Sequence, residues 1–143
     1  MINSPIKKMN MIILMEHDLE AAVAFYKSLG IECKFHMAGK WAEFNLGNVN
    51  LGLCPTQQEP FDRRTGVVLE IENIQQFYDD HKESIAFLEE PFVAVHGIMV
   101  SVKDPGGNVF DLYQPTPEKV KDLADKVAQK CGDKKSSCGD CPC

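Results

Sequence analysis

Four cysteines near the end of the chain form the densest group of reactive side chains in the sequence. They fall within the last 13 residues with the spacing C-x6-C-x2-C-x-C, and they are Cys131, Cys138, Cys141 and Cys143. Thiolates are ligands for soft metal ions, so this segment could hold one Zn²⁺, Cu(I), Cd²⁺ or Hg²⁺ ion. The C-x2-C pair could alternatively cycle as a dithiol, and a segment without fixed structure and without a role for its thiols is the third interpretation.

A carboxylate on a predicted strand forms the second reactive feature. The stretch from Lys103 to Pro115 reads K-D-P-G-G-N-V-F-D-L-Y-Q-P. Its first half has the proline and glycines of a tight turn, and its second half alternates as a strand does. Phe110 and Leu112 are predicted to face a core, whereas the opposite face carries Val109, Asp111 and Tyr113. Glu43 and Glu70 could join Asp111 in a cluster suited to proton transfer, unless they are paired with Lys103 or exposed.

Strands and two helices must position these side chains. The first series is a buried strand at Met9 to Met15, a helix between the capping residue Asp18 and Gly30, and strands at Ile31 to Met37, Trp41 to Leu46 and Val49 to Cys54. After a proline-containing linker from Pro55 to Arg64, a second series begins. It comprises a strand at Gly66 to Ile71, a helix capped by Asn73, strands at Ile85 to Leu88, Phe92 to Val95 and Ile98 to Lys103, and the stretch that ends at Pro115. The repeated order predicts a duplicated α+β module, at about 9–55 and 66–115, within one domain at 1–115.

The chain is expected to continue beyond this domain in two segments. Residues 116–130 have an apolar stripe at helical spacing and predict an amphipathic C-terminal helix. Residues 131–143 are polar and rich in small residues, which indicates a flexible cysteine-rich tail.

Composition limits the class of function. The net charge is −6 and no basic cluster is interleaved with aromatic residues, so nucleic acid is not an expected partner. No apolar run approaches the ~20 residues of a membrane span, so no membrane partner is expected. The first residues have no apolar signal segment, which makes a cytoplasmic location the default expectation.

Two motifs resemble the glyoxalase/bleomycin-resistance superfamily, also called the vicinal oxygen chelate proteins. They are H-D-L-E-A-A-V-A-F-Y-K-S-L-G at His17 to Gly30 and D-P-G-G-N-V-F-D-L-Y-Q-P at Asp104 to Pro115, and F-L-E-E-P at Phe87 to Pro91 fits the same pattern. The resemblance covers Met9 to about Pro115. It implies two βαβββ modules whose strands form a curled mixed sheet around a cleft. Members include metal-dependent isomerases, lyases and dioxygenases, thiol transferases and metal-free proteins that sequester drugs.

The resemblance also implies where a metal would be bound. Ligands in metal-dependent members come from the first and last strands of each module, which here correspond to Met11, Leu51 or Gly52, Gly66 and Asp111. Only Asp111 is a suitable ligand, at a position where the family usually has glutamate. A single carboxylate cannot hold a divalent ion that needs about four to six ligands, so no cofactor is expected in the cleft.

The expected cleft has an apolar floor with a few polar groups, which is typical of a small-molecule site. Alternation along the strands predicts that it is lined by Met11, Ile13, Trp41, Glu43, Glu70, Met99, Ser101, Asp111 and Tyr113. Methionines that merely fill a core are the alternative interpretation.

Two functions remain open at this stage. The first is a metal-independent binder of a small organic ligand, with soft-metal or thiol chemistry in the tail. The second is a lyase, an isomerase or a thiol-linked detoxifying enzyme. A homodimer is the default among oligomers.

Overall fold

A computed structural model describes residues 4–116, 118, 125 and 127–128. The chain divides into two compact units. The first unit consists of Met1–Thr65 with Lys103–Val109, and the second consists of Gly66–Val102 with Phe110–Cys143. Each unit is described below by itself.

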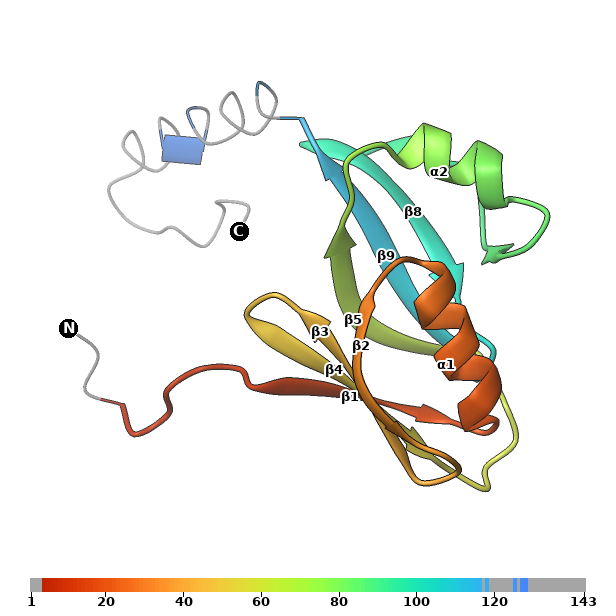
Figure 1. Cartoon of the computed structure of the whole chain (residues 1–143). Coiled ribbons are helices and arrows are strands. Elements are labelled where there is room, and N and C mark those ends of the chain that lie inside the picture. Colours follow the sequence, from red (N-terminus) through yellow and green to blue (C-terminus); the bar gives the residue numbers. More distant parts are fainter. Residues whose placement is uncertain (1–3, 117, 119–124, 126, 129–143) are drawn as a thin grey trace. The chain divides into compact units, whose positions relative to one another are not determined.

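The first unit is built on a four-stranded mixed sheet. Its elements in chain order are β1 (Met11–Glu16), α1 (Leu19–Ser28), β2 (Glu32–Met37), β3 (Trp41–Leu46) and β4 (Val49–Pro55). The strands lie in the order β1-β4-β3-β2, with β1 parallel to β4 and the other neighbours antiparallel. Figure 1 shows these strands in red to yellow. The strand–helix–three-strand series predicted for the first half of the chain is therefore present.

Helix α1 covers one face of this sheet. The side chain of Asp18 accepts a hydrogen bond from the backbone N–H of Ala21 and caps the helix, as its sequence position predicts. The turns after the helix and between the strands use glycines with positive φ, which an L side chain disfavours. The helix and the sheet bury a shared apolar core, whose members are Leu14, Leu19, Ala22, Val23, Tyr26, Ala42, Phe44, Leu51 and Leu53.

A second sheet repeats the strand order of the first. It is formed by β5 (Arg63–Glu70), β6 (Ala86–Phe87), β7 (Phe92–Val93), β8 (Gly97–Lys103) and β9 (Asn108–Pro115), and α2 (Ile74–His81) lies between β5 and β6 in the chain. The order is β5-β9-β8-β6, and β7 pairs separately with β8. Asn73 caps α2 as predicted. Phe110 and Leu112 are buried, which confirms the predicted core face of β9.

Three strands, β5, β6 and β7, differ from the sequence prediction in ways that have a structural reason. Strands β6 and β7 are two residues each, because Pro91 interrupts the segment and the N–H of Ala94 turns back to the carbonyl of Gly97. Strand β5 begins within the predicted linker, because the N–H of Arg63 donates to the carbonyl of Gly107 at 2.8 Å. A contact far along the chain thus extends a strand into a segment with no strand signal of its own.

The predicted C-terminal helix lies largely outside the described residues. Glu118, Asp125, Val127 and Ala128 are helical. The cysteine-rich tail at 131–143, with its four predicted metal ligands, lies outside the described residues entirely. Within the described part of the chain, no helix is both long and apolar enough to cross a membrane.

Candidate functional site

Four of the predicted cleft residues share the face of the first sheet that α1 leaves uncovered. In the strand register, Ile13 pairs with Gly52 and Gly52 with Glu43, so these residues form a row across three strands. Met11 stands two residues from Ile13, and Trp41 two residues from Glu43, on the same face. The register thus puts these four residues on one face of the sheet, and their role in lining a cleft stays a prediction.

The indole of Trp41 lies over Gly52. A Cβ built at Gly52 would be 2.6 Å from the Cη2 atom of the indole and 3.0 Å from the sulfur of Met11. The glycine therefore leaves the space that the aromatic ring occupies. The indole N–H donates to Glu43 Oε1 at 3.3 Å, a contact that helps to hold the ring in this position.

Glu43 is the polar point on this apolar face. Its side chain is buried, and its second oxygen lies 3.5 Å from the ammonium group of Lys34. One carboxylate is thus held between an indole donor and a lysine. The arrangement can orient a bound molecule by one hydrogen bond while the apolar floor supplies contact area.

The second unit brings together Ser101 and Asp111. The hydroxyl of Ser101 donates to Asp111 Oδ1 at 2.6 Å, and the backbone N–H of Ser101 donates to Glu89 at 2.6 Å. Two carboxylates therefore contact Ser101. The sequence analysis had predicted Asp111 as a site residue but not Glu89.

Tyr113, on the same strand as Asp111, contacts His96, which directly precedes β8. The hydroxyl of Tyr113 is 2.6 Å from Nδ1 of His96 and 3.4 Å from the carbonyl oxygen of the same residue. A Cβ at Gly97 would lie 2.7 Å from the Tyr113 ring, so the absence of a side chain there lets the ring reach the histidine. The contact of His96 with Tyr113 is a finding of the structure.

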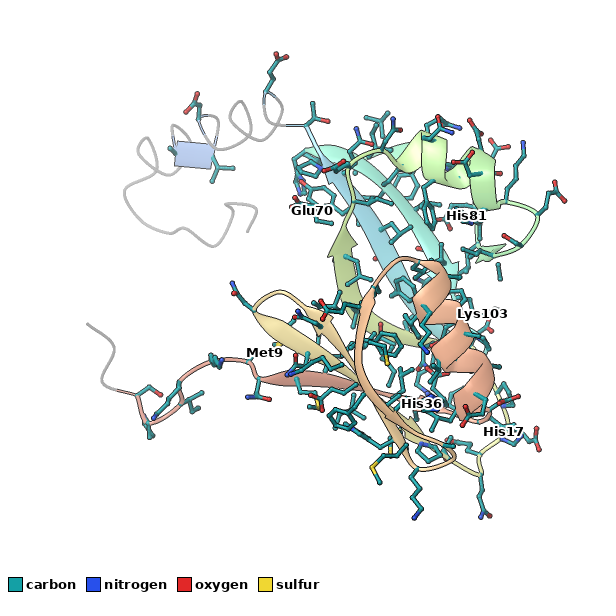
Figure 2. All side chains as sticks on the ribbon, viewed as in Figure 1. Met9, His17, His36, Glu70, His81 and Lys103 are labelled. Atoms are coloured by element: carbon teal, nitrogen blue, oxygen red, sulfur yellow. The ribbon has the colours of Figure 1, made fainter. Side chains whose placement is uncertain are left out.

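The nine predicted cleft residues thus fall into two sets on two units. The remaining two, Glu70 on β5 and Met99 on β8, belong to the second unit, and Figure 2 labels Glu70. The grouping of all nine residues in one cleft stays a prediction.

The positions implied for a divalent metal do not carry suitable donors. Leu51 is buried on the helix-covered face, whereas Gly52 lies on the same face as Met11 and is covered by the indole. Gly66 has a φ of 76°, a conformation that disfavours any side chain. Met11 and Asp111 remain, and a thioether with one carboxylate does not fit the oxygen- and nitrogen-rich site of such an ion.

Three of the histidines lie on or beside three different elements. Figure 2 shows His17 after β1, His36 on β2 and His81 at the end of α2. Among the residues that the structure describes, no group of three or more His, Cys, Asp and Glu side chains is placed to hold a metal ion. An open hollow of about 570 Å³ in the first unit contains none of the nine predicted residues, and its lining is Lys8, Met9, Gly47, Asn48 and Val49.

A buried polar cluster in the first unit was missed by the sequence analysis. Glu16 is fully buried, and its Oε2 accepts a hydrogen bond from the amide of Asn108 at 3.1 Å. Asp104 accepts hydrogen bonds from the Tyr26 hydroxyl at 2.7 Å, from the Asn108 amide at 3.1 Å and from two backbone N–H groups of its own turn. Arg63 donates to Asn108 Oδ1 at 2.8 Å and completes the cluster.

Two groups in this cluster have displaced pKa values. Burial raises the pKa of Glu16 to about 9, and the nearby Asp104 carboxylate adds to the rise. Burial also raises the pKa of Tyr26 well above its ordinary value, again with a contribution from the charge of Asp104. At neutral pH, Glu16 is therefore the protonated partner of a carboxyl–carboxylate pair.

A signal for this cluster was present in the sequence. Glu16 alternates with Leu14 on β1, which places it on the face beneath α1, and the turn from Asp104 carries polar residues with short side chains. Nothing in the sequence pairs this turn with β1, because the two are far apart in the chain.

Comparisons with known proteins identify the fold. The chain has a TM-score of 0.66 to a glyoxalase/bleomycin resistance protein/dioxygenase from Nocardioides, at 23% identity, covering 80% of this chain and 87% of that one. For TnmS3, an antibiotic binding protein from Streptomyces sp. CB03234, the TM-score is 0.64 at 21% identity, with 80% and 100% covered. For a lactoylglutathione lyase from Agrobacterium tumefaciens it is 0.62 at 18% identity, with 78% and 96% covered.

The chain therefore has the α+β fold of the glyoxalase/bleomycin-resistance superfamily, which its two motifs indicated. No protein-family model matches the sequence. No curated protein matches it significantly.

Proposed function

We propose that this protein binds a small, partly apolar organic molecule on the uncovered face of its first sheet. The single observation that carries the proposal is the exposure of large apolar side chains around one fixed indole. Ile13, Phe35 and Met37 are 52%, 46% and 52% exposed, and they stand beside Trp41 and Glu43 on that face. Exposed apolar surface that gathers around a few polar groups marks a binding surface.

A solved structure of the same fold supports this choice. The protein from Streptomyces sp. CB03234 is described as antibiotic binding, and it is matched over its whole length. An apolar face with one carboxylate suits a molecule with an extended unsaturated or aromatic part and one donor group. We expect the donor to meet Glu43 and the apolar part to lie on Trp41.

No divalent metal takes part in this proposed binding. This proposal is supported by the residues at the four positions from which metal-dependent members of the superfamily bind their metal. Two of these positions are Gly52 and Gly66, which have no side chain to act as a ligand. Elemental analysis of the full chain with its four tail cysteines replaced by serine tests this point. We expect less than stoichiometric Ni, Zn, Mn and Fe, and one such ion per chain would contradict it.

The tail is proposed to bind a soft metal ion separately from the organic ligand. The support is its sequence alone, four cysteines within 13 residues. Native mass spectrometry of the full chain with Cd²⁺ should show one ion per chain, which the four serine replacements remove. The same spectra test the expected homodimer, and retention of the ion by the serine variant would exclude the tail site.

The organic-ligand proposal is tested with the fluorescent probe 8-anilinonaphthalene-1-sulfonate. Because Trp41 is the sole tryptophan, energy transfer from tryptophan to the probe reports binding near this face. Ile13→Asp should abolish the transfer, because a charge is placed on the apolar floor. Val95→Asp is the matched control, since Val95 is an exposed apolar residue of the second unit. Equal transfer in wild type and Ile13→Asp would refute the proposal.

An acid–base enzyme is the second candidate, favoured by the pairs in the second unit. The 2.6 Å contacts of Ser101 with Asp111 and of Tyr113 with His96 are suited to moving a proton. The similarity to a lactoylglutathione lyase is consistent with such chemistry. If the protein turns over a cleft ligand and Asp111→Asn abolishes this turnover, the result would support the enzyme. Turnover that Asp111→Asn leaves unchanged would exclude the Asp111 carboxylate as the acid or base.

A further inference from the structure

One carboxylate on helix α1 holds the end of the hairpin that carries Trp41. Oε1 of Glu20 accepts a hydrogen bond from the backbone N–H of Gly39 at 2.9 Å, and Oε2 lies 2.9 Å from Nε2 of His36. Glu20 is in the first turn of α1, whereas His36 is on β2 and Gly39 is in the turn between β2 and β3. The carboxylate therefore fastens the hairpin to the helix at two points.

These two points lie on either side of Met37, the residue that pairs with Trp41. His36 (labelled in Figure 2) pairs with the fully buried Ala42, so its side chain is on the helix-covered face. The next pair along the hairpin, Met37 with Trp41, is on the uncovered face. Glu20 thus acts on the hairpin from the face opposite to that of the proposed ligand.

The position of Trp41 depends on this end of the hairpin. The register of β3 with β4 begins at Ala42, so Trp41 lies one residue before its first pair. On the β2 side, Trp41 pairs with Met37, whose carbonyl accepts the turn hydrogen bond from the N–H of Lys40 at 2.9 Å. The indole nevertheless extends over Gly52 on β4. A movement of the hairpin end therefore carries the ring across the proposed ligand face.

The strength of this fastening depends on the charge of His36. The hydrogen bond from Gly39, with a further contribution from His36, lowers the pKa of Glu20, so the carboxylate is charged at neutral pH. Nε2 of His36 is buried, and histidine is the side chain that most readily changes its charge between about pH 5 and 8. A protonated His36 forms an ion pair with Glu20, whereas a neutral His36 has a weaker contact with it.

The other charged groups near the hairpin have different contacts. Asp18, at the start of α1, acts through its charge on the same carboxylate. Lys34 on β2 lies 3.5 Å from Glu43, and Lys40 is exposed in the turn. Among the described residues, the carboxylate on α1 is therefore the charged group that contacts the imidazole of His36.

We propose that Glu20 and His36 are positioning residues for the ligand face, and that protonation of His36 strengthens ligand binding by holding the indole in place. This inference rests on the proposed function, because it concerns the control of that same face. A ligand that needs the indole in place binds only the fraction of molecules in which it is, and the apparent affinity falls with that fraction. Binding is therefore tighter at about pH 5.5 than at about pH 8.

The indole ¹H–¹⁵N signal of the sole tryptophan tests the positioning without any ligand. Between about pH 5.5 and about pH 8, we expect a transition of this signal in the wild type that His36→Gln and Glu20→Gln both lack. Glu20→Gln keeps an oxygen that can accept from Gly39 and removes only the charge. Because the Glu20 side chain is 54% exposed, the fold should tolerate this substitution even if His36→Gln unfolds.

The same proteins are then titrated with 8-anilinonaphthalene-1-sulfonate, with energy transfer from Trp41 as the readout. The wild type should bind the probe about two- to fivefold more tightly at about pH 5.5 than at about pH 8, and His36→Gln should show no such difference. Glu20→Ala removes both contacts and should weaken binding at about pH 5.5 by about two- to tenfold. Glu20→Gln should recover part of that loss.

A second histidine–glutamate contact in the first unit supplies the matched control. Nε2 of His17 lies 3.8 Å from Oε2 of Glu59, and Nδ1 of His17 lies 3.1 Å from the carbonyl oxygen of Gln58. This histidine thus contacts the linker after β4 and not the hairpin. His17→Gln and Glu59→Gln should leave the transition of the indole signal and the affinity for the probe as they are in the wild type.

Two results would each overturn this inference while leaving the proposed function intact. One is a transition of the indole signal that His36→Gln and Glu20→Gln both retain. The other is an affinity for the probe that Glu20→Ala leaves unchanged while Ile13→Asp abolishes binding. An absence of energy transfer in the wild type would instead refute the proposed function, and the ligand-free indole signal would still decide whether Glu20 and His36 position Trp41.

Discussion

Raising the pH should destabilise this protein through one residue, Glu16. The side chain is fully buried, and its Oε1 has no hydrogen-bond partner among the described residues. Burial, followed by the neighbouring Asp104, raises the pKa of Glu16 from 4.5 to about 9. A neutral Glu16 can donate a hydrogen bond to Asp104, whereas a charged one would place two carboxylates together in the interior.

The sign and size of the effect follow from proton linkage. The folded pKa of Glu16 is above the unfolded value, so the folded state binds the extra proton between pH 4.5 and about 9. This stabilisation is complete below pH 4.5 and is lost as the pH rises through 9. One pKa unit corresponds to about 1.4 kcal/mol, so raising the pH from 7 to 10 should lower the free energy of unfolding by about 3 kcal/mol.

Urea unfolding followed by tryptophan fluorescence at pH 7, 8, 9 and 10 measures this loss. Glu16→Gln keeps the shape of the neutral acid and can still donate to Asp104, but it cannot lose a proton. The free energy of unfolding of this variant should therefore lack the decrease that the ionisation of Glu16 causes between pH 7 and pH 10. Glu32→Gln, an exposed glutamate on β2, is the control and should behave as wild type. Other groups that titrate near pH 10 change the free energy of unfolding equally in the wild type and in both variants, so the difference between the proteins reports Glu16. Identical pH dependence in wild type and Glu16→Gln would refute the assignment of a neutral buried Glu16.

Three further substitutions test single contacts. Gly52→Ala should displace the indole of Trp41, because the new Cβ would be 2.6 Å from the ring, and the tryptophan emission maximum should shift; an unchanged spectrum would contradict the packing described. Tyr113→Phe should lower the free energy of unfolding by about 0.5–1.5 kcal/mol, because it removes the hydrogen bond to His96. NMR titration should also show a changed environment of the His96 ring. No change in either measurement would contradict the Tyr113–His96 contact. Gly107→Ala should lower the free energy of unfolding by more than about 1 kcal/mol, because φ of Gly107 is 90° and the new Cβ would meet the backbone of Phe61. A melting temperature equal to that of the wild type would contradict this expectation.

The local chemistry of the sequence predicted most of the fold. Asp18 and Asn73 cap their helices because each offers a side-chain oxygen to the first turn, and this depends only on neighbouring residues. Alternation predicted which residues share a sheet face, so Trp41, Glu43 and Ile13 were expected together. Such signals repeat every two residues and need no knowledge of the tertiary structure.

Contacts between distant segments could not be predicted in this way. The pairing of the Asp104 turn with Glu16 joins residues far apart in the chain, and nothing in their local sequence specifies it. The placement of the Trp41 indole over Gly52 depends on the strand register, which fixes which residue of β4 stands opposite. The Tyr113–His96 pair likewise depends on the missing side chain at Gly97. In each case, packing rather than propensity decides the geometry.

Two-dimensional ¹H–¹⁵N NMR of the full chain with 8-anilinonaphthalene-1-sulfonate tests the proposed binding face most directly. The sole tryptophan gives one indole N–H signal, which can be followed without ambiguity. We expect the largest shifts at this signal and at the amides of Met11–Glu16, Trp41–Leu46 and Val49–Pro55. Shifts that leave the indole signal unmoved and gather instead on β7 and β8 would contradict the proposed site.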